Sequence, residues 1–181
     1  MRNRVLCMLL LLSALATACV SGAGQSKPAR PASVEVLFSP KGGCQDAIFR
    51  ELGAGKTYVH LQAYSFTSAP IARALVEAHK RGGKVEVVID KDRVTENYSE
   101  ATYFANQGLP VLSDGKHAIA HNKVMVIDGQ TVLTASFTFT KAAEESNAEN
   151  LLVIRSAEIA EKYEKNYQEH LAHSVKRERG Q

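Results

Sequence analysis

Residues His121 to Asn150 read HNKVMVIDGQTVLTASFTFTKAAEESNAEN. This stretch indicates both the fold of the chain and its chemistry. It opens with His121, Lys123 and Asp128 in the pattern H-x-K-x-x-x-x-D. The apolar run between Lys123 and Asp128 predicts a buried β-strand. Alternate side chains share one face of a strand, so His121 and Lys123 are expected to point the same way.

The residues after this strand predict a hairpin. Asp128-Gly129 is a favourable pair for a tight turn, and residues 131–137 predict the returning strand. An imidazole, an ammonium and the hydroxyl of Ser136 are then expected at one end of a sheet. A neutral imidazole can attack phosphorus, a lysine can neutralise a non-bridging oxygen, and a hydroxyl can donate a hydrogen bond to another. The set therefore indicates phosphate chemistry in which the lysine supplies the positive charge and no metal is needed.

This spacing resembles a known signature. The order His121, Lys123, Asp128, followed after six intervening residues by Ala135-Ser136, is similar to the HKD signature of the phospholipase D superfamily. The similarity is closest to its small members with a single motif, the bacterial endonucleases. Further segments that look like parts of those nucleases are 63–67, 74–76, 80–82, 88–90 and 139–144. The resemblance implies a phospholipase D-like fold and a phosphodiesterase that acts through a phosphohistidine without metal or cofactor.

The resemblance also implies a role for each site residue. His121 would be the nucleophile. Superfamily enzymes use two such motifs and this chain has one, so a homodimer with a shared active site would supply a second His121 as the general acid. Lys123 and Ser136 would hold the non-bridging oxygens. Glu149 would fix the tautomer of His121, and Asp128 would orient Lys123 or the hairpin.

Two residues depart from the family pattern. Ala135 stands where the family usually has glycine, which is a mild change if the backbone dihedral angles allow a Cβ. Thr138 stands where the family usually has asparagine, two residues after the serine. Thr138 stays among the expected phosphate-binding residues, but the chain loses an amide donor there, which puts the rate and the substrate in question.

Predicted strands and helices alternate along the rest of the chain. This alternation indicates an α/β domain, and the hairpin makes its sheet mixed, with helices flanking it. Segment 140–147 is expected to be a polar loop. A stripe of Tyr163, Tyr167 and Leu171 predicts the core-facing side of the last helix. The expected strands are 34–38, 57–64, 84–90, 109–112, 124–127, 131–137 and 151–154, and the expected helices are 46–52, 70–81, 99–106 and 157–175.

The N-terminal residues predict export. Arg2 and Arg4 precede a short apolar run and an A-x-A pattern that ends at Ala18, as in a secretory signal peptide. The apolar run is short for a membrane anchor, which needs about 20 residues. Cleavage after Ala18 would make Cys19 the first residue of the mature protein. Cys19 would then be either free or modified with a lipid anchor, and the sequence leaves both alternatives open. The expected organisation of this periplasmic or secreted protein is a signal peptide at 1–18, a flexible linker at 19–33, a catalytic domain at 34–176 and a charged tail at 177–181.

The net charge and the cysteine spacing argue against a nucleic-acid coat protein and against a zinc site. The formal net charge is +3, and cleavage after Ala18 would remove two arginines and no acids, which leaves +1. This is not the basic excess of a general nucleic-acid coat protein. The sequence has no CxxC pair and no His/Cys cluster, so no zinc site is expected. His117 is interpreted as a loop residue that can touch the substrate.

Three functions remain open at this point. The leading hypothesis is an exported endonuclease that hydrolyses DNA or RNA, since the resemblance is to small nucleases. The second is a phospholipase D that hydrolyses phosphatidylcholine-type phospholipids to phosphatidate. The third is a non-catalytic dimer that binds polyanions, disabled at Thr138. The intact His121, Lys123 and Glu149 argue against this third hypothesis.

Overall fold

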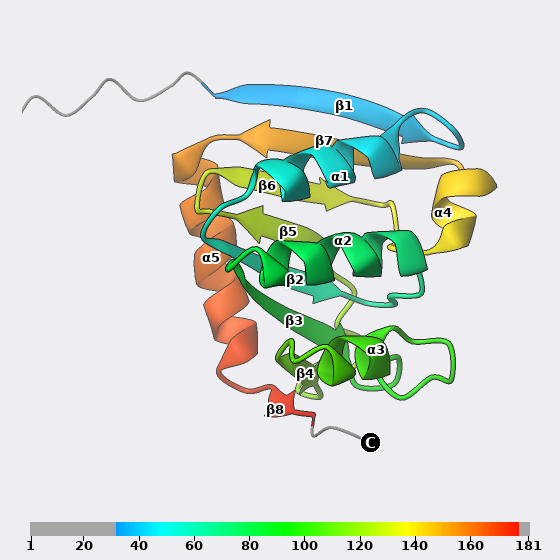
Figure 1. Ribbon diagram of the computed structural model, residues 1–181, viewed down its shortest axis with the longest axis vertical. Coiled ribbons are helices and arrows are strands. Elements are labelled where there is room, and N and C mark those ends of the chain that lie inside the picture. Colours follow the sequence, from blue (N-terminus) through cyan, green and yellow to red (C-terminus); the bar gives the residue numbers. More distant parts are fainter. Residues whose placement is uncertain (1–31, 178–181) are drawn as a thin grey trace, which may run out of the picture.

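An eight-stranded mixed sheet runs through residues 32–177, the part of the chain that the computed structural model describes (Figure 1). The strand order across the sheet is β1-β7-β6-β5-β2-β3-β4-β8. The strands are β1 (Ser33–Ser39), β2 (Tyr58–Ala63), β3 (Lys84–Asp90), β4 (Val111–Asp114), β5 (Lys123–Ile127), β6 (Thr131–Ala135), β7 (Glu149–Arg155) and β8 (Val175–Lys176). The helices are α1 (Cys44–Ala54), α2 (Ala69–Lys80), α3 (Ala101–Asn106), α4 (Lys141–Glu145) and α5 (Ala157–Leu171). The expected α/β class and mixed sheet are confirmed.

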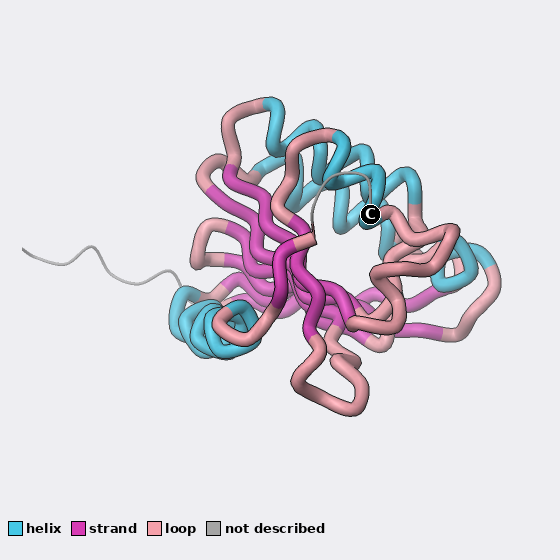
Figure 2. Tube along the Cα trace, turned by 90° about the horizontal axis from the view of Figure 1, so that it is seen from below, coloured by secondary structure: helices cyan, strands magenta, loops and turns pink. Residues whose placement is uncertain are grey.

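Helices cover both faces of the sheet. Figure 2 shows the layer of α1, α2 and α3 on one side of the strands and α5, seen end-on, on the other. The main core lies between the sheet and the first layer, where Ile48 and Leu75 pack against Met125. On the other face Tyr167 is buried with Leu171 beside it, and Tyr163 packs on a second apolar cluster, which confirms the predicted core stripe of α5.

The direction of β5 determines which strand ends lie at the same edge of the sheet. Strands β2, β3 and β4 are parallel, whereas β5 pairs with β2 antiparallel, with Lys123 opposite Ala63. The end of β2 and the start of β5 therefore lie at the same edge of the sheet. Because β6 returns antiparallel to β5 and β7 antiparallel to β6, the end of β6 and the start of β7 lie there too. We call this the active edge.

Two segments form structure that the sequence analysis did not predict. Residues 141–145 form helix α4 instead of a loop, because the Thr140 hydroxyl caps it by accepting the Ala143 N–H at 3.2 Å. Helix α5 ends at Leu171 and not at 175, and the chain then pairs with β4 as β8. The helix end is fixed by the Ser174 hydroxyl, which donates to the carbonyl of His170 at 2.8 Å.

The returning strand of the hairpin is also shorter than predicted. β6 ends at Ala135, and the Asn150 N–H donates to the hydroxyl of Ser136 at 3.1 Å. The Phe137 N–H then donates to the carbonyl of Asn150 at 3.2 Å. A side chain thus enters the hydrogen-bond ladder at Ser136, which ends the regular strand and fixes the serine at the active edge.

The predicted signal peptide at 1–18, Cys19 with nearly all of the linker at 19–33, and the tail beyond Arg177 lie outside the described residues. Among residues 32–177, no helix combines the length and the apolar character needed to cross a bilayer. Cys44 is buried at the start of α1, and burial is the main cause that raises the pKa of its thiol to about 11. This thiol is therefore a packing residue and not a reactive group.

Candidate active site

Four neighbouring strands supply the residues of the active edge. His121 and Lys123 stand at the start of β5, and Tyr64 follows the end of β2. Ser136 follows β6, and Glu149 opens β7. The Tyr64 N–H donates to the carbonyl of Asn122 at 2.9 Å, which extends the β2–β5 pairing one step beyond the strands. The structure thus brings the predicted His121, Lys123, Ser136 and Glu149 to one edge.

The imidazole of His121 is exposed and open to a substrate. Its ring lies 4.6 Å from the ring of Tyr64, centroid to centroid, at an interplanar angle of 58°. Within residues 32–177, neither ring nitrogen of His121 has a hydrogen-bond partner. The packing on Tyr64 limits how the ring can turn, while a nitrogen stays available as a nucleophile.

Lys123 is the buried member of the pair. The residue is 7% exposed, and its Nζ donates to the carbonyl of His121 at 2.9 Å. The same ammonium lies 5.3 Å from the centroid of the Tyr64 ring, within the range of a cation–π contact. Burial lowers the pKa of Lys123 below its ordinary value, and the negative charge of Glu149 opposes this. A partly dehydrated ammonium attracts a phosphate oxygen more strongly than one in water does.

The hydroxyl of Ser136 is oriented by Asn150. The backbone N–H and the side-chain amide of Asn150 both donate to its Oγ, at 3.1 and 3.2 Å. These bonds fill the acceptor positions of the hydroxyl and leave its hydrogen to donate to a phosphate oxygen. Thr138 is half-buried, and its hydroxyl donates to the carbonyl of Ser136 at 3.4 Å. Asn150 is thus an amide beside the serine, although it comes from β7 and not from the segment after β6 that contains Thr138.

Glu149 does not hold His121 in the described part of the chain. Its carboxylate accepts a hydrogen bond from the Asn147 amide at 3.2 Å, and its charge acts on Lys123. The role of Glu149 in fixing the tautomer of His121 therefore stays a prediction.

Asp128 lies apart from the other predicted site residues. It follows the far end of β5, five residues and ~16 Å from Lys123. Its carboxylate accepts hydrogen bonds from the N–H groups of Lys56, Thr57 and Tyr58 at 2.8 to 2.9 Å and from the Thr57 hydroxyl at 2.6 Å. Burial raises the pKa of Asp128, but these hydrogen bonds outweigh it and lower the pKa overall. Of its two predicted roles, Asp128 orients the hairpin and not Lys123.

Sequence reasoning missed three residues that position the site. The guanidinium of Arg93 lies 4.7 Å from the centroid of the Tyr64 ring and also donates to the Tyr64 hydroxyl. Asp90 is buried at the end of β3, and its carboxylate accepts the Ala120 N–H at 2.8 Å, one residue before His121. Tyr64 and Asp90 are the last residues of the predicted strands 57–64 and 84–90, which end at this edge, and that was a usable signal. Arg93 lies in a polar loop and gave none.

Comparison with known proteins agrees with this geometry. A family model described as "Cardiolipin synthase, PLD-like domain" matches residues 48–171. The chain is 36% identical over 134 residues to a phospholipase D of Rickettsia felis, which covers 74% of this chain and 67% of the relative. It is 31% identical over 146 residues to the mitochondrial cardiolipin hydrolase of Xenopus laevis, which covers 75% of this chain and 69% of the relative.

Two solved structures match nearly their whole length. One is Nuc of Salmonella typhimurium, a phospholipase D family member, with a TM-score of 0.79 and 38% identity over 82% of this chain and 99% of that chain. The other is NucT of Helicobacter pylori, with a TM-score of 0.76 and 25% identity over 81% of this chain and 100% of that chain. The fold and the site define a phosphodiester hydrolase on a mixed α/β sheet. The chain belongs to the phospholipase D superfamily.

The contacts of Asp128 predict a loss of stability without a loss of chemistry. Asp128→Ala should lower the free energy of unfolding by about 1–3 kcal/mol, because several N–H donors lose a charged acceptor and alanine must adopt φ 54°. Asp128→Asn should cost less, since asparagine tolerates this backbone region and keeps an acceptor. Urea denaturation would measure both, and the kcat of the folded variants should be unchanged.

The pH dependence of this contribution has a definite sign. The folded-state pKa of Asp128 is lowered, so its stabilisation is present above the ordinary aspartate value of about 3.9 and is lost as pH falls through the folded pKa. The stability difference between wild type and Asp128→Asn should therefore shrink as pH falls below about 4. An equal difference at neutral and acid pH would contradict this role.

Proposed function

We propose that the chain is an endonuclease that hydrolyses phosphodiester bonds of DNA or RNA without a metal ion in the reaction. The observation that carries the proposal is the pairing of an exposed His121 with a buried Lys123 on one face of β5, beside a Ser136 hydroxyl whose hydrogen is left to donate. An exposed nucleophile at a sheet edge suits a polymer that lies across the edge. The resemblance to small bacterial endonucleases supports the same substrate.

The proposed reaction has two displacement steps at phosphorus. A neutral nitrogen of His121 attacks phosphorus, the bond to the leaving oxygen breaks, and a phosphohistidine forms. The leaving oxygen takes a proton from a second imidazole on its far side. That imidazole then removes a proton from water, and the hydroxide breaks the P–N bond and frees His121. Lys123 and Ser136 neutralise and hydrogen-bond the non-bridging oxygens in both steps.

The second imidazole is proposed to be His121 of another copy of the chain. One chain carries one His-x-Lys motif, yet the reaction needs a nucleophile and an acid on opposite sides of phosphorus. An isologous two-fold contact places the same residue of both subunits near the axis. The exposure of His121 leaves it able to meet a phosphate held between two copies.

A phospholipid is the second candidate substrate, and exposed apolar side chains favour it. Phe38 is 63% exposed on β1 directly opposite Asn150, and Ile119 is 57% exposed two residues before His121. Apolar side chains beside a phosphodiesterase site fit an acyl chain as well as a base. Relatives named phospholipase D and cardiolipin hydrolase point the same way.

A substrate panel in excess EDTA tests the proposed function. Supercoiled plasmid, single-stranded nucleic acid and phosphatidylcholine vesicles would be offered to protein that circular dichroism shows to be folded. Nucleic acid should be cut and the vesicles left intact. His121→Ala should lower the rate on the order of 10³-fold or more. Lys123→Met should lower it about 10²- to 10³-fold, as for one lost donor at a transition-state charge.

His79→Gln is the matched control, because His79 lies on α2 and its ring hydrogen-bonds only the carbonyl of Gly83 among the described residues. It should be as active as wild type. Hydrolysis of phosphatidylcholine with intact nucleic acid would establish the second candidate in place of the first. Folded protein that cuts nothing in EDTA but regains activity with magnesium would refute the metal-free reaction.

Mixed dimers test the shared site. Wild type and His121→Ala would be co-refolded at varying ratios, and heterodimers should be inactive because each lacks one imidazole. Activity should therefore fall roughly as the square of the wild-type fraction, the expectation for one site on a two-fold axis. Mixtures of wild type with His79→Gln should keep full activity at every ratio. A linear fall with His121→Ala, or a fully active monomer in sedimentation, would rule out the shared site.

We also propose that the protein is exported, on the evidence of its N-terminal sequence. Residues Met1 to Ala18 should be absent from the mature protein, and Cys19 should be its first residue. Intact-mass measurement of protein from the producing cell would distinguish a free Cys19 from one that carries a diacylglycerol. A mature protein that retains Met1 would contradict export by cleavage.

A further inference from the structure

Four side chains of the types that can bind a metal ion meet on the α5 face of the sheet. Asp114 and His117 come from the end of β4 and the segment after it, and His170 and His173 come from the end of α5. One ligand atom from each residue lies within 4.8 Å of all the others. Side chains alternate along a strand, so Asp114 shares a face with Leu112, which packs on Tyr167 of α5. Lys123, by contrast, shares its face with Met125 of the main core.

Asp114 is the centre of this cluster. Its side chain is fully buried, and Nδ1 of His170 lies 2.6 Å from its Oδ2. Nε2 of His173 lies 3.0 Å from Oδ1, and Nδ1 of His117 lies 3.5 Å from Oδ2. All three rings thus turn a nitrogen to the same carboxylate.

An ion pair alone does not account for three imidazoles around one carboxylate. The ring centroids of His117, His170 and His173 lie only 4.9 to 5.4 Å apart. An ion pair needs one imidazole, whereas here three surround Asp114. A divalent cation accounts for all three, because it binds neutral imidazoles and supplies the charge that the carboxylate needs.

The dimensions of the cluster fit a tetrahedral ion. Zinc binds histidine nitrogen and carboxylate oxygen at about 2.0–2.2 Å, which puts neighbouring ligand atoms about 3.3 Å apart in a tetrahedron. The contacts to Asp114 lie between 2.6 and 3.5 Å, so small movements of the side chains would admit the ion. Three imidazoles and one carboxylate also form a donor set that suits zinc and excludes magnesium and calcium, which prefer oxygen alone.

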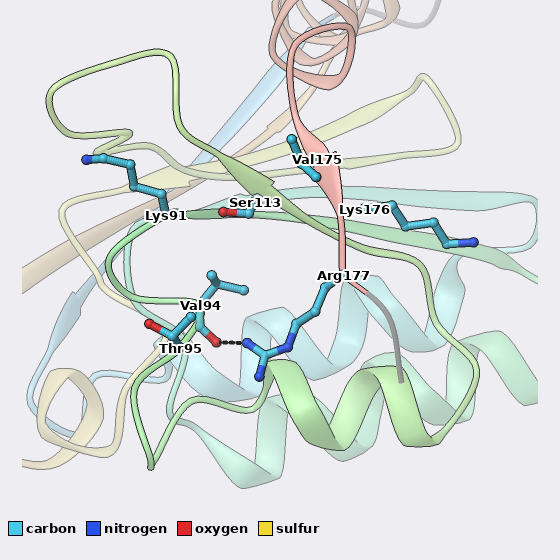
Figure 3. Close-up of a pocket in the computed structure, with 7 residues that line it drawn as sticks. All are labelled: Lys91, Val94, Thr95, Ser113, Val175, Lys176 and Arg177. Carbon is cyan, nitrogen blue, oxygen red and sulfur yellow. Dashed lines mark hydrogen bonds between the residues drawn. The ribbon is translucent and has the colours of Figure 1, made fainter. Parts of the chain in front are cut away.

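The backbone on both sides of the cluster is fixed. Asp114 accepts the Lys116 N–H at 3.1 Å, and β8 pairs with β4 directly after His173. Figure 3 shows Val175 of β8 beside Ser113 of β4, and Arg177 donating to the carbonyl of Val94. These contacts of β8 and Arg177 fix the segment that follows α5, next to His170 and His173. Ligands held in place before the ion arrives lose little entropy on binding it.

We propose that Asp114, His117, His170 and His173 bind one divalent transition-metal ion, with zinc the best fit. Four protein ligands close the coordination sphere, as in structural zinc sites. The ion would join the end of α5 to segment 115–120, whose last residue is held by Asp90 and precedes His121. Its role would be to stabilise that segment, and it would take no part in the reaction at phosphorus.

Metal content and thermal unfolding test this site without any substrate. The mature chain would be purified with a tag that contains no histidine, stripped with chelator, dialysed and titrated with zinc sulfate. We expect one zinc per chain and a rise in Tm of about 5–10 °C when free zinc is 100-fold above its Kd. Cobalt in place of zinc should give the strong visible absorption of a tetrahedral complex.

Variants at the ligands should abolish these signals. His170→Ala with His173→Gln should remove stoichiometric zinc, the Tm shift and the cobalt spectrum. His117→Ala should weaken zinc binding at least about tenfold, and it is the safer variant because the His117 side chain is 44% exposed and lies in a loop. His79→Gln should bind zinc as wild type does.

Wild-type protein that binds no stoichiometric zinc, or a folded His117→Ala variant with unchanged affinity, would overturn the proposal. So would octahedral cobalt absorption in the wild type. None of these results depends on the proposed nuclease activity, because no substrate is present. Conversely, an inactive protein that binds one zinc would refute the proposed function and leave the metal site standing.

Discussion

The antiparallel pairing of β5 with β2 is the constraint on which the site depends. It sets Lys123 opposite Ala63 and puts the start of β5 where β2 ends, so that Tyr64 can pack on His121. A slip of one residue in this register would turn every side chain of β5 to the other face. Lys123 would then point toward α5, and the apolar residues that fill both cores would exchange sides.

The start of β5 gives the two basic residues of the motif opposite environments. Lys123 is the first residue inside the hydrogen-bonded ladder and is almost fully buried, whereas His121 precedes the ladder and is exposed. The attraction between a cation and a phosphate is stronger where water is excluded, so burial suits Lys123. A nucleophile must be accessible to the substrate, so exposure suits His121. Two positions at the rim of a sheet meet both needs, and the Lys123 hydrogen bond to the His121 carbonyl locks them together.

The sequence predicted the parts of the fold that local patterns encode. Strand and helix periodicity located nearly every element, and the H-x-K spacing located His121 and Lys123 on one face. Contacts between distant segments could not be predicted in this way. Asp128 was expected to orient either Lys123 or the hairpin, and its partners are the N–H groups of a segment some 70 residues earlier. The pairs Asp114-x-x-His117 and His170-x-x-His173 resembled no zinc pattern, because only the fold brings them together.

The position of β1 has a consequence for the order in which the sheet can form. β1 is the earliest strand of the described residues, yet its only sheet partner among them is β7, with Ser33 opposite Arg155. Pairings between residues so far apart in sequence slow folding, since a long loop must close before the contact forms. During synthesis, β1 therefore emerges first and stays unpaired until β7 has been synthesised. Until then, the alternating apolar side chains of Val34, Val36 and Phe38 stand on a strand without a neighbour, the kind of segment that chaperones protect from aggregation.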